Sequence, residues 1–239
     1  MNIAVIFAGG SGRRMNTVSR PKQFLELQGK PIIIYTLELF ENHPDIDGIV
    51  VVCIADWIPF LQKCLRKFEI TKVVRIVPGG VTGQESIYKG LCATEEYAKD
   101  DNPIVLIHDG VRPLITEKTI TDNIAMVRES GNCITCVPAI ETFIVKQDDG
   151  TISIPTRANS YVARAPQSFR LHDIIAAHRR SQMEGKADFI DSCSLMSHYG
   201  HRMNTIIGPM ENIKITTPTD FFVFRAMVEV HENQQIFGF

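Results

Sequence analysis

The 239-residue sequence predicts an α/β fold built on a mostly parallel sheet. The first observation behind this prediction is that short apolar runs alternate with longer stretches of helical periodicity. The second is that charged motifs follow several of these runs, as expected where a site lies beyond the carboxyl ends of parallel strands. The hydrophobic content of 44% is ordinary for a single domain, so we treat residues 1–239 as one unit.

The expected elements form a Rossmann-like sheet with flanking helices. Strands are predicted at 3–7, 48–54, 72–77, 104–109 and 134–140. Helices are predicted at 32–40, 57–65, 85–98, 116–130 and 172–184. A last helix is expected after Thr217, because this residue supplies a hydroxyl cap, Pro218 suits the first position and Asp220 places a carboxylate in the first turn.

One segment, residues 142–157, interrupts the alternation and has the pattern of a β-hairpin that turns at Asp149-Gly150. A hairpin alone is barely stable in water, so an arm with apolar side chains needs a surface to pack against. We therefore expect an arm at about 141–158 that projects from the domain and joins two subunits as a homodimer.

Charge and hydropathy exclude two classes of partner. The formal net charge of −2 argues against a protein that coats nucleic acid, which is normally strongly basic. The sequence has no apolar stretch as long as a membrane span, and its start lacks the basic region and cleavage site of a signal peptide. We expect a cytoplasmic protein with a small anionic ligand.

The loop after the first apolar run suggests that this ligand carries phosphate. Its glycines allow close approach of the backbone, and Arg13, Arg14 and Lys22 could neutralise a triphosphate. The loop fits neither the dinucleotide pattern G-x-G-x-x-G nor the Walker A pattern. A surface turn with solvated arginines is the alternative.

Three charged or titratable residues later in the chain are further candidates. Asp109 ends an apolar run where a carboxylate is otherwise poorly placed, so we expect it to meet a metal ion or a ribose hydroxyl, with Arg112 as its ion-pair partner. His108 is expected to be neutral and to orient its loop by a hydrogen bond. Lys214 lies in a short strand-like run, where an exposed edge lysine is the plain interpretation.

Five ordered motifs across nearly the whole chain resemble those of sugar-type nucleotidyltransferases, specifically the cytidylyltransferases that make CDP-methylerythritol or CDP-ribitol. They are A-G-G-S-G-R-R-M with P-K-Q at 8–23, P-G-G with Gln84 and Ser86, H-D-G-V-R-P at 108–113, Arg157 with A-P-Q at 165–167, and N-I-K-I-T at 212–216.

The resemblance implies transfer of CMP from CTP to a polyol phosphate, with release of pyrophosphate and with Mg2+ as the divalent cation. It implies a CTP site at Phe7, Ala8, Gly9, Gly10, Ser11, Gly12, Arg13, Gly80, Gly83, Gln84, Ser86 and Asp109, with Asp109 as metal ligand. It implies catalytic roles for Arg14, Lys22, Arg157 and Lys214, and acceptor binding by Arg112, Glu141, Thr142, Arg157 and Lys214. The arm residues among these act across the dimer in the family that the chain resembles.

Two positions depart from the family pattern. Gly83 stands where arginine is common, which removes one cation that faces the phosphates. Glu141-Thr142 stands where methylerythritol enzymes commonly have Asp-Thr. The spacing from Arg14 to Lys22 and the form P-T-R-A…Y…A-P-Q-S-F-R are more similar to the ribitol-phosphate branch.

We therefore expect D-ribitol 5-phosphate as the acceptor, with 2-C-methyl-D-erythritol 4-phosphate as the alternative. A module that binds CTP without turnover is an alternative of another class, which only the glycine at position 83 favours. A glycosyltransferase is disfavoured because the H-D-G sequence at 108–110 is not a D-x-D metal motif.

Overall fold

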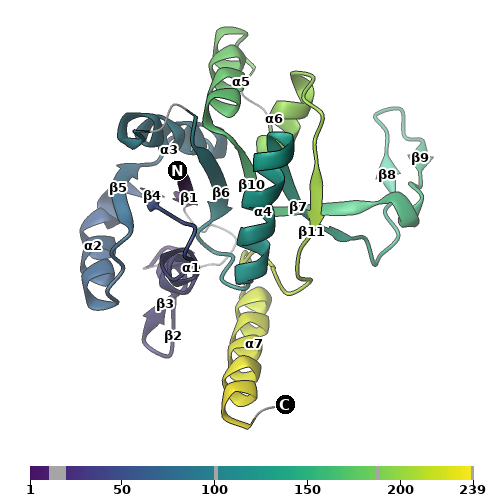
Figure 1. The fold of residues 1–239 in the computed structure, drawn as a ribbon. Helices are drawn as coiled ribbons and strands as arrows, with labels where there is room; N and C mark the ends of the chain where they lie inside the picture. Colours follow the sequence, from purple (N-terminus) through teal and green to yellow (C-terminus); the bar gives the residue numbers. More distant parts are fainter. Residues whose placement is uncertain (11–19, 100–101, 187–188, 238–239) are drawn as a thin grey trace.

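The structure is a computed structural model that describes residues 1–10, 20–99, 102–186 and 189–237, without the side chains of 234–237. In this part of the chain one central sheet has the strand order β11-β7-β10-β6-β1-β4-β5. Its strands are β1 (Asn2–Ala8), β4 (Gly48–Cys53), β5 (Val73–Pro78), β6 (Ile104–Asp109), β7 (Asn132–Pro138), β10 (Tyr161–Arg170) and β11 (Thr205–Ile207). The predicted α/β fold with a mostly parallel sheet is confirmed (Figure 1).

Strand β10 is the exception to the parallel arrangement and was not predicted. It runs antiparallel to both of its neighbours, β6 and β7, whereas the other pairs in the sheet are parallel. The apolar runs at 3–7, 48–54, 72–77, 104–109 and 134–140 all became strands, because each supplies side chains for the core on both faces of the sheet.

Helices cover both faces of the sheet. In β1, Ala4 and Ile6 face α1 (Ile32–Glu41), α2 (Ile58–Lys67) and α4 (Glu117–Ser130). Between them, Val5 points the other way, toward α3 (Gly83–Tyr97), α5 (Leu171–Met183) and α6 (Ser192–His198). Alternate residues of one strand therefore fill two separate cores.

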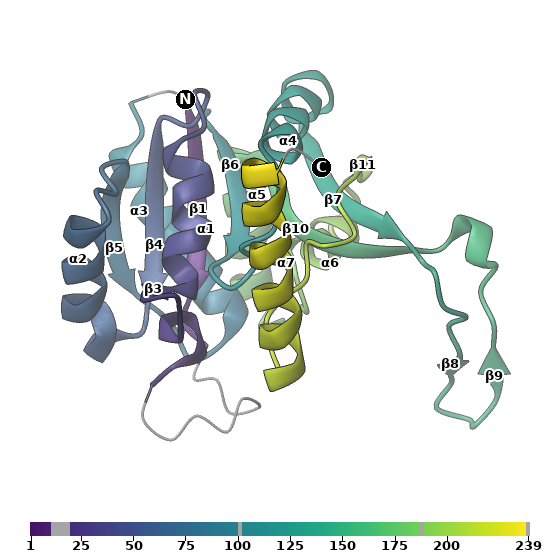
Figure 2. The same cartoon turned by 90° about the horizontal axis from the view of Figure 1, so that it is seen from below.

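The last helix, α7 (Pro218–Phe237), begins as predicted. Asp220 accepts hydrogen bonds from the backbone N–H groups of Thr216 and Thr217, and its own N–H donates to the Thr217 hydroxyl. Figure 2 shows α7 beside α1, and the rings of Phe224 and Tyr35 meet edge to face with centroids 5.2 Å apart. This contact fixes the segment that precedes α7 against the domain.

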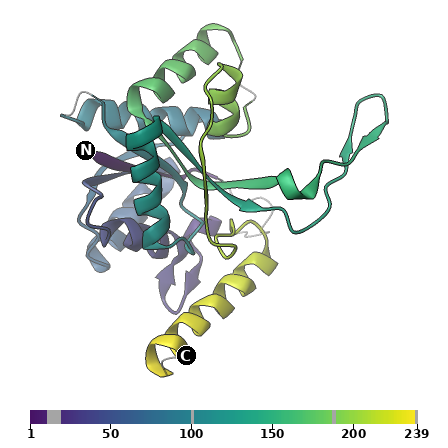
Figure 3. The same cartoon turned by 45° about the vertical axis from the view of Figure 1, so that its right-hand side comes forward.

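Two small hairpins complete the described part of the fold, with short 3-10 turns at Lys22–Phe24, Ala55–Trp57 and Arg157–Asn159. One hairpin pairs β2 (Glu26–Leu27) with β3 (Lys30–Pro31). The other pairs β8 (Val145–Lys146) with β9 (Ile152–Ser153) and turns at Gly150, whose φ is 85°. It lies in the segment between β7 and β10, here called the arm, which stands away from both helical layers in Figures 1 and 3. Among the described residues, no helix is both long and apolar enough to cross a membrane.

Candidate active site

A pocket of about 510 Å3 opens at the carboxyl ends of β1 and β6, beside the first turn of α3. The charged groups in its described lining are Lys22, Asp109 and Lys214. The full described lining is Phe7, Ala8, Gly9, Gly10, Lys22, Gln23, Gly80, Val81, Thr82, Gly83, Ser86, Asp109, Val111 and Lys214. Residues from four of the five sequence motifs thus meet at the edge of the sheet where ligands bind in α/β folds.

The loop after β1 forms one wall of the pocket through Gly9 and Gly10. Gln23 holds the next segment against this wall, because its Nε2 donates to the carbonyl of Ala8 at 2.5 Å. Gln23 is buried, and its neighbour Lys22 reaches into the pocket. The Nζ of Lys22 donates to the carbonyl of Ile215 at 3.0 Å. The predicted residues Ser11, Gly12, Arg13 and Arg14 lie outside the described residues.

The start of α3 forms the opposite wall. Ser86 Oγ accepts a hydrogen bond from the Gly80 N–H and donates to the Thr82 carbonyl, which closes the loop into a tight turn. Glycine is favoured at position 80, since a Cβ there would collide with the Glu85 side chain, including its Cβ. Gly83 lines the pocket at the first turn of the helix. Backbone N–H groups at such a helix start favour an anionic ligand.

The second loop also contains one predicted residue that does not reach the pocket. Gln84 is absent from the described lining, and its Nε2 donates to the Phe189 carbonyl at 3.1 Å. In the structure Gln84 therefore ties α3 to the segment before α6 rather than facing the pocket.

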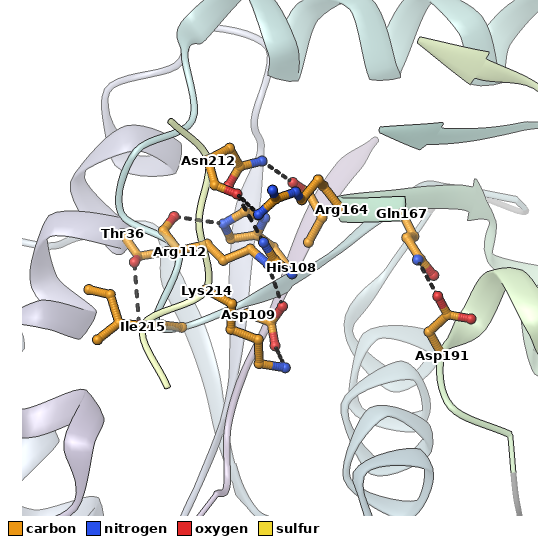
Figure 4. Close-up of polar contacts among 12 residues, drawn as sticks. Thr36, His108, Asp109, Arg112, Arg164, Gln167, Asp191, Asn212, Lys214 and Ile215 are labelled. Carbon is orange, nitrogen blue, oxygen red and sulfur yellow. Dashed lines mark hydrogen bonds and ion pairs between the residues drawn. The ribbon is translucent and has the colours of Figure 1, made fainter. Parts of the chain in front are cut away.

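Asp109 is the negative centre of the site. It is 5% exposed, and its two oxygens accept from the Arg112 Nε at 2.7 Å and the Lys214 Nζ at 2.5 Å (Figure 4). Burial alone would raise the pKa of this carboxyl, but the charges of Lys214 and Arg112 outweigh burial and hold the pKa at about 2. Asp109 is thus ionised at neutral pH, and the predicted ion pair with Arg112 is confirmed.

His108 orients the loop behind Asp109. It is fully buried, and its Nε2 lies 3.1 Å from the Arg112 carbonyl, which can only accept, so Nε2 carries the proton. Burial lowers the pKa of His108 to about 4. The expected neutral histidine with a hydrogen bond to its own loop is confirmed.

The segment before α7 brings Lys214 to the pocket, but not as part of a strand. The prediction of a strand at Lys214 was wrong, because this segment does not pair with a strand of the sheet. The Ile215 N–H makes one backbone hydrogen bond, to the Val111 carbonyl at 2.9 Å. Ile213 and Ile215 instead pack beneath α7. Both isoleucine side chains belong to this small core, and the Lys214 side chain between them points toward Asp109.

The arm residues do not join the pocket of their own subunit. Glu141, Thr142 and Arg157 are exposed and are absent from its described lining. Exposed apolar side chains share the arm and its base: Ile140, Phe143, Ile144, Val145, Ile152, Ile154 and Tyr161.

The described residues hold no ready-made metal cage, since no group of three potential ligands comes together among them. Asp109 is the one carboxylate in the described lining of the pocket. Mg2+ is commonly bound by one or two carboxylates together with substrate phosphates. The donor set therefore fits an ion that arrives with a triphosphate.

Sequence reasoning missed two residues that join the hydrogen-bond network of Arg112. Asn212, from the quoted N-I-K-I-T motif, is buried, and its main-chain carbonyl accepts from the Nη1 of Arg112 at 2.9 Å. Arg164, at the start of β10, donates to the same carbonyl at 3.1 Å. A basic residue in the run Y-V-A-R-A-P-Q was the available signal for Arg164.

Comparison with known proteins agrees with this geometry. The family model of 2-C-methyl-D-erythritol 4-phosphate cytidylyltransferase matches residues 2–230. A ribitol-5-phosphate cytidylyltransferase of Vibrio parahaemolyticus is 52% identical over all of both chains, and one of Streptococcus agalactiae is 51% identical over the same extent. A 2-C-methyl-D-erythritol 4-phosphate cytidylyltransferase of Clostridium botulinum is 36% identical, over 95% of this chain and 97% of its own.

Solved structures point the same way. The crystal structure of 4-diphosphocytidyl-2C-methyl-D-erythritol synthase from Anaerococcus prevotii superposes with a TM-score of 0.80 at 27% identity, over 95% of this chain and 96% of that one. The relatives are named as enzymes, so the alternative of a module without turnover is not supported. The chain belongs to the 2-C-methyl-D-erythritol 4-phosphate cytidylyltransferase family, a family of nucleotidyltransferase enzymes.

Proposed function

We propose that the protein transfers CMP from CTP to D-ribitol 5-phosphate, which yields CDP-ribitol and pyrophosphate. The observation that carries this proposal is the 52% identity, over the full length, to a relative named for ribitol 5-phosphate, against 36% to one named for methylerythritol phosphate. The motif at 155–170 favours the same branch. A cytoplasmic homodimer that supplies an activated pentitol for a surface polymer fits this assignment.

The reaction is an in-line displacement at the α-phosphorus of CTP. A phosphate oxygen of the acceptor forms the new P–O bond, and the bond to the β-phosphate oxygen breaks as pyrophosphate leaves. A phosphomonoester is largely a dianion at neutral pH, so the attacking oxygen carries no proton that must be removed. The protein therefore has to position two polyanions and stabilise the added charge, not supply a base.

The cations of the pocket suit that task. Lys22 lies between the glycine loop and Ile215, where its charge would stabilise the transition state together with Arg14. Lys214 and Arg112 would hold the acceptor phosphate near Asp109. His108 is neutral and hydrogen-bonded to the Arg112 carbonyl, and it takes no part in proton transfer.

Asp109 would hold Mg2+ together with the triphosphate, or bind a ribose hydroxyl of CTP. Its carboxyl is ionised, as metal ligation requires. When bound, the ion would neutralise charge on the phosphates. The glycine turn at Gly80 and the backbone at the start of α3 would line the remaining phosphate oxygens.

The arm would complete the site of a second subunit. Its exposed apolar residues, among them Ile144 and Ile152, need a partner surface, and its polar residues Glu141, Thr142 and Arg157 are absent from the described lining of their own pocket. In a homodimer with exchanged arms, Arg157 would reach the acceptor phosphate of the other subunit.

The test is pyrophosphate release from CTP and Mg2+ with D-ribitol 5-phosphate and 2-C-methyl-D-erythritol 4-phosphate in parallel. We expect a much larger kcat/KM for ribitol 5-phosphate. A larger kcat/KM for methylerythritol phosphate would replace the proposed acceptor with the alternative. Release with neither acceptor would refute both.

A further inference from the structure

We propose that Arg164 is a further acceptor-binding residue, whose guanidinium group contributes positive charge to the subsite for the acceptor phosphate. This inference rests on the proposed function and adds a residue to it. The argument begins with the position of Arg164 at the start of β10, close to the end of β6.

The sheet register places Arg164 beside the active-site end of β6. Strand β10 pairs antiparallel with β6 from Gln167 onward, where Gln167 lies opposite Ile107. The pairing of β10 with β7 shifts register between Ala163 and Gln167. Arg164 falls in this irregular stretch, on the side of Gln167 toward which β6 continues to Asp109. The direction of its side chain is therefore not set by the regular alternation of a paired strand.

The side chain turns toward the cations of the site. Arg164 and Arg112 both donate an Nη1 hydrogen to one acceptor, the carbonyl of Asn212, at 3.1 and 2.9 Å (Figure 4). Two guanidinium groups that share one carbonyl are close neighbours, and their charges repel. Asn212 is itself fixed, because its Nδ2 donates to the carbonyl of Ala165. The two guanidinium groups are thus held together by the Asn212 carbonyl, whose residue is fixed by the backbone of β10.

Arg164 has no counter-ion of its own among the described residues. Its one hydrogen bond there goes to the Asn212 carbonyl, and its buried Nε has no partner. Burial and the charge of Arg112 both lower the pKa of Arg164, so its charge is less favourable here than on a solvated arginine, although it remains protonated. A half-buried cation next to another cation is costly unless an anion binds there.

The balance of charge around Asp109 matches a phosphomonoester. Arg112 and Lys214 contact Asp109, which brings one negative charge. Arg164 lies outside the described lining of the pocket and adds a third positive charge beside Arg112, through the Asn212 carbonyl that both donate to. These four groups of one subunit thus carry a surplus of two positive charges, which favours a dianionic phosphate over a neutral group. Arg112 donates its Nε hydrogen to Asp109 and an Nη1 hydrogen to the Asn212 carbonyl. Arg164 donates to the Asn212 carbonyl through Nη1, and its remaining N–H groups have no hydrogen-bond acceptor among the described residues.

The variants R164Q and R164K separate charge from hydrogen bonding. Glutamine can still donate to the Asn212 carbonyl but carries no charge, and lysine keeps the charge. We expect R164Q to raise the KM for D-ribitol 5-phosphate by about 10- to 100-fold, since a charge-assisted hydrogen bond is lost. R164K should recover part of that loss, and the KM for CTP should change by less than about 3-fold.

The matched control is R170Q on the same strand. Arg170 also donates to a backbone carbonyl, that of Asn102, but lies opposite Ile104 at the far end of β6. R170Q should leave both KM values at the wild-type level. Inhibition by inorganic phosphate at saturating CTP identifies the group that Arg164 binds, and the inhibition constant should rise in R164Q in parallel with the acceptor KM.

Three outcomes would overturn the inference. Equal loss of CTP and acceptor affinity in R164Q, with a lower Tm and no rescue in R164K, would make Arg164 a purely structural tie to Asn212. An unchanged inhibition constant for phosphate would assign Arg164 to the polyol rather than the phosphate. An unchanged acceptor KM in R164Q would remove Arg164 from the site. Failure of the wild-type protein to use any polyol phosphate is a different result, which refutes the proposed function itself.

Discussion

At the scale of single residues, the site stores more positive than negative charge. Asp109 is buried and remains ionised because Lys214 and Arg112 are in direct contact with it. Removal of one partner of such a buried pair costs more than the pair contributes, since it leaves a charge without a counter-ion. Substitutions of Asp109 therefore disturb folding as well as chemistry. We use Lys22, which lines the pocket and donates to the Ile215 carbonyl, as the probe of catalysis.

The variant K22A should lower kcat by about 100-fold or more, because it removes a charge that acts on the transition state. The KM for CTP should change by only a few-fold, since the glycine loop and the start of α3 still hold the nucleotide. Steady-state kinetics at saturating acceptor measure both values. A loss confined to CTP binding, with kcat intact, would contradict the assigned role.

Two buried histidines should make stability depend on pH below neutrality. Burial lowers the pKa of both His108 and His178 to about 4. Between pH 6.5 and 4 the unfolded chain binds protons at these positions and the native state does not, so the free energy of unfolding falls as pH falls through this window. Above pH 6.5 the contribution is complete. Each histidine should lower the free energy of unfolding by about 2 kcal/mol at pH 5 relative to neutral pH.

His178 is the better site for the test because it lies outside the pocket, on α5, and its Nε2 has no partner among the described residues. In H178Q the loss of stability between pH 7.5 and 5, measured by urea unfolding, should be smaller than in the wild type by about 2 kcal/mol. The control I174V, on the same helix, should lower stability equally at both pH values. An unchanged pH dependence in H178Q would show that His178 does not titrate on unfolding.

At the scale of elements, the start of α3 carries the clearest departure from the family pattern. A Cβ at Gly83 would meet no atom of the described residues within 4 Å, so a side chain fits there. The variant G83R should lower the KM for CTP several-fold, because it adds a cation beside the phosphates. Without CTP it should be less stable than G83A by up to about 1 kcal/mol, since a cation is unfavourable at a helix N-terminus.

The variant G83A is the control for G83R, because it adds a side chain of better helix propensity but no charge. It should leave the KM for CTP unchanged. Steady-state kinetics and thermal unfolding with and without CTP measure both effects. A higher KM for CTP in G83R than in G83A would contradict this expectation. It would show that a long side chain at position 83 obstructs the nucleotide instead of binding its phosphates.

The parallel strands and most helices could be predicted because their signals are local. The run Gly48–Cys53, for example, is apolar throughout and buried throughout. Strand β10 could not be predicted in this way, since Arg164 and Pro166 interrupt its pattern and its partners, β6 and β7, lie far away in the sequence. The apolar pair Ile213 and Ile215 misled for a related reason, because burial beneath α7 gives the same alternation as a strand.

The site residues that belong to a recognisable sequence motif could be predicted. The position of Lys22, Asp109 and Lys214 in one pocket follows the resemblance. The sharing of the Asn212 carbonyl by Arg112 and Arg164 does not, because it depends on contacts between residues 100 and 48 positions apart in the sequence. Such contacts leave no periodic trace in a sequence.

At the scale of the whole molecule, the arm carries a group of apolar side chains that the described residues of the same chain leave exposed. Ile144, Ile152 and Ile154 are more than 60% exposed. The proposed homodimer would bury these side chains, and closed twofold symmetry is the commonest arrangement for identical subunits. Deletion of residues 144–154 should therefore give a monomer in analytical ultracentrifugation, with little activity.

A mixture of two inactive variants tests whether the arm serves the other subunit. In K22A the pocket is defective and the arm is intact, and in R157A the reverse holds. If Arg157 acts in its own subunit, no dimer of the mixture has a complete site. If it acts across the dimer, each mixed dimer has one complete site, and co-refolded equal amounts should recover about a quarter of wild-type activity. The same mixture made with the variant that lacks 144–154 in place of R157A should recover nothing, because without the arm the subunits do not pair.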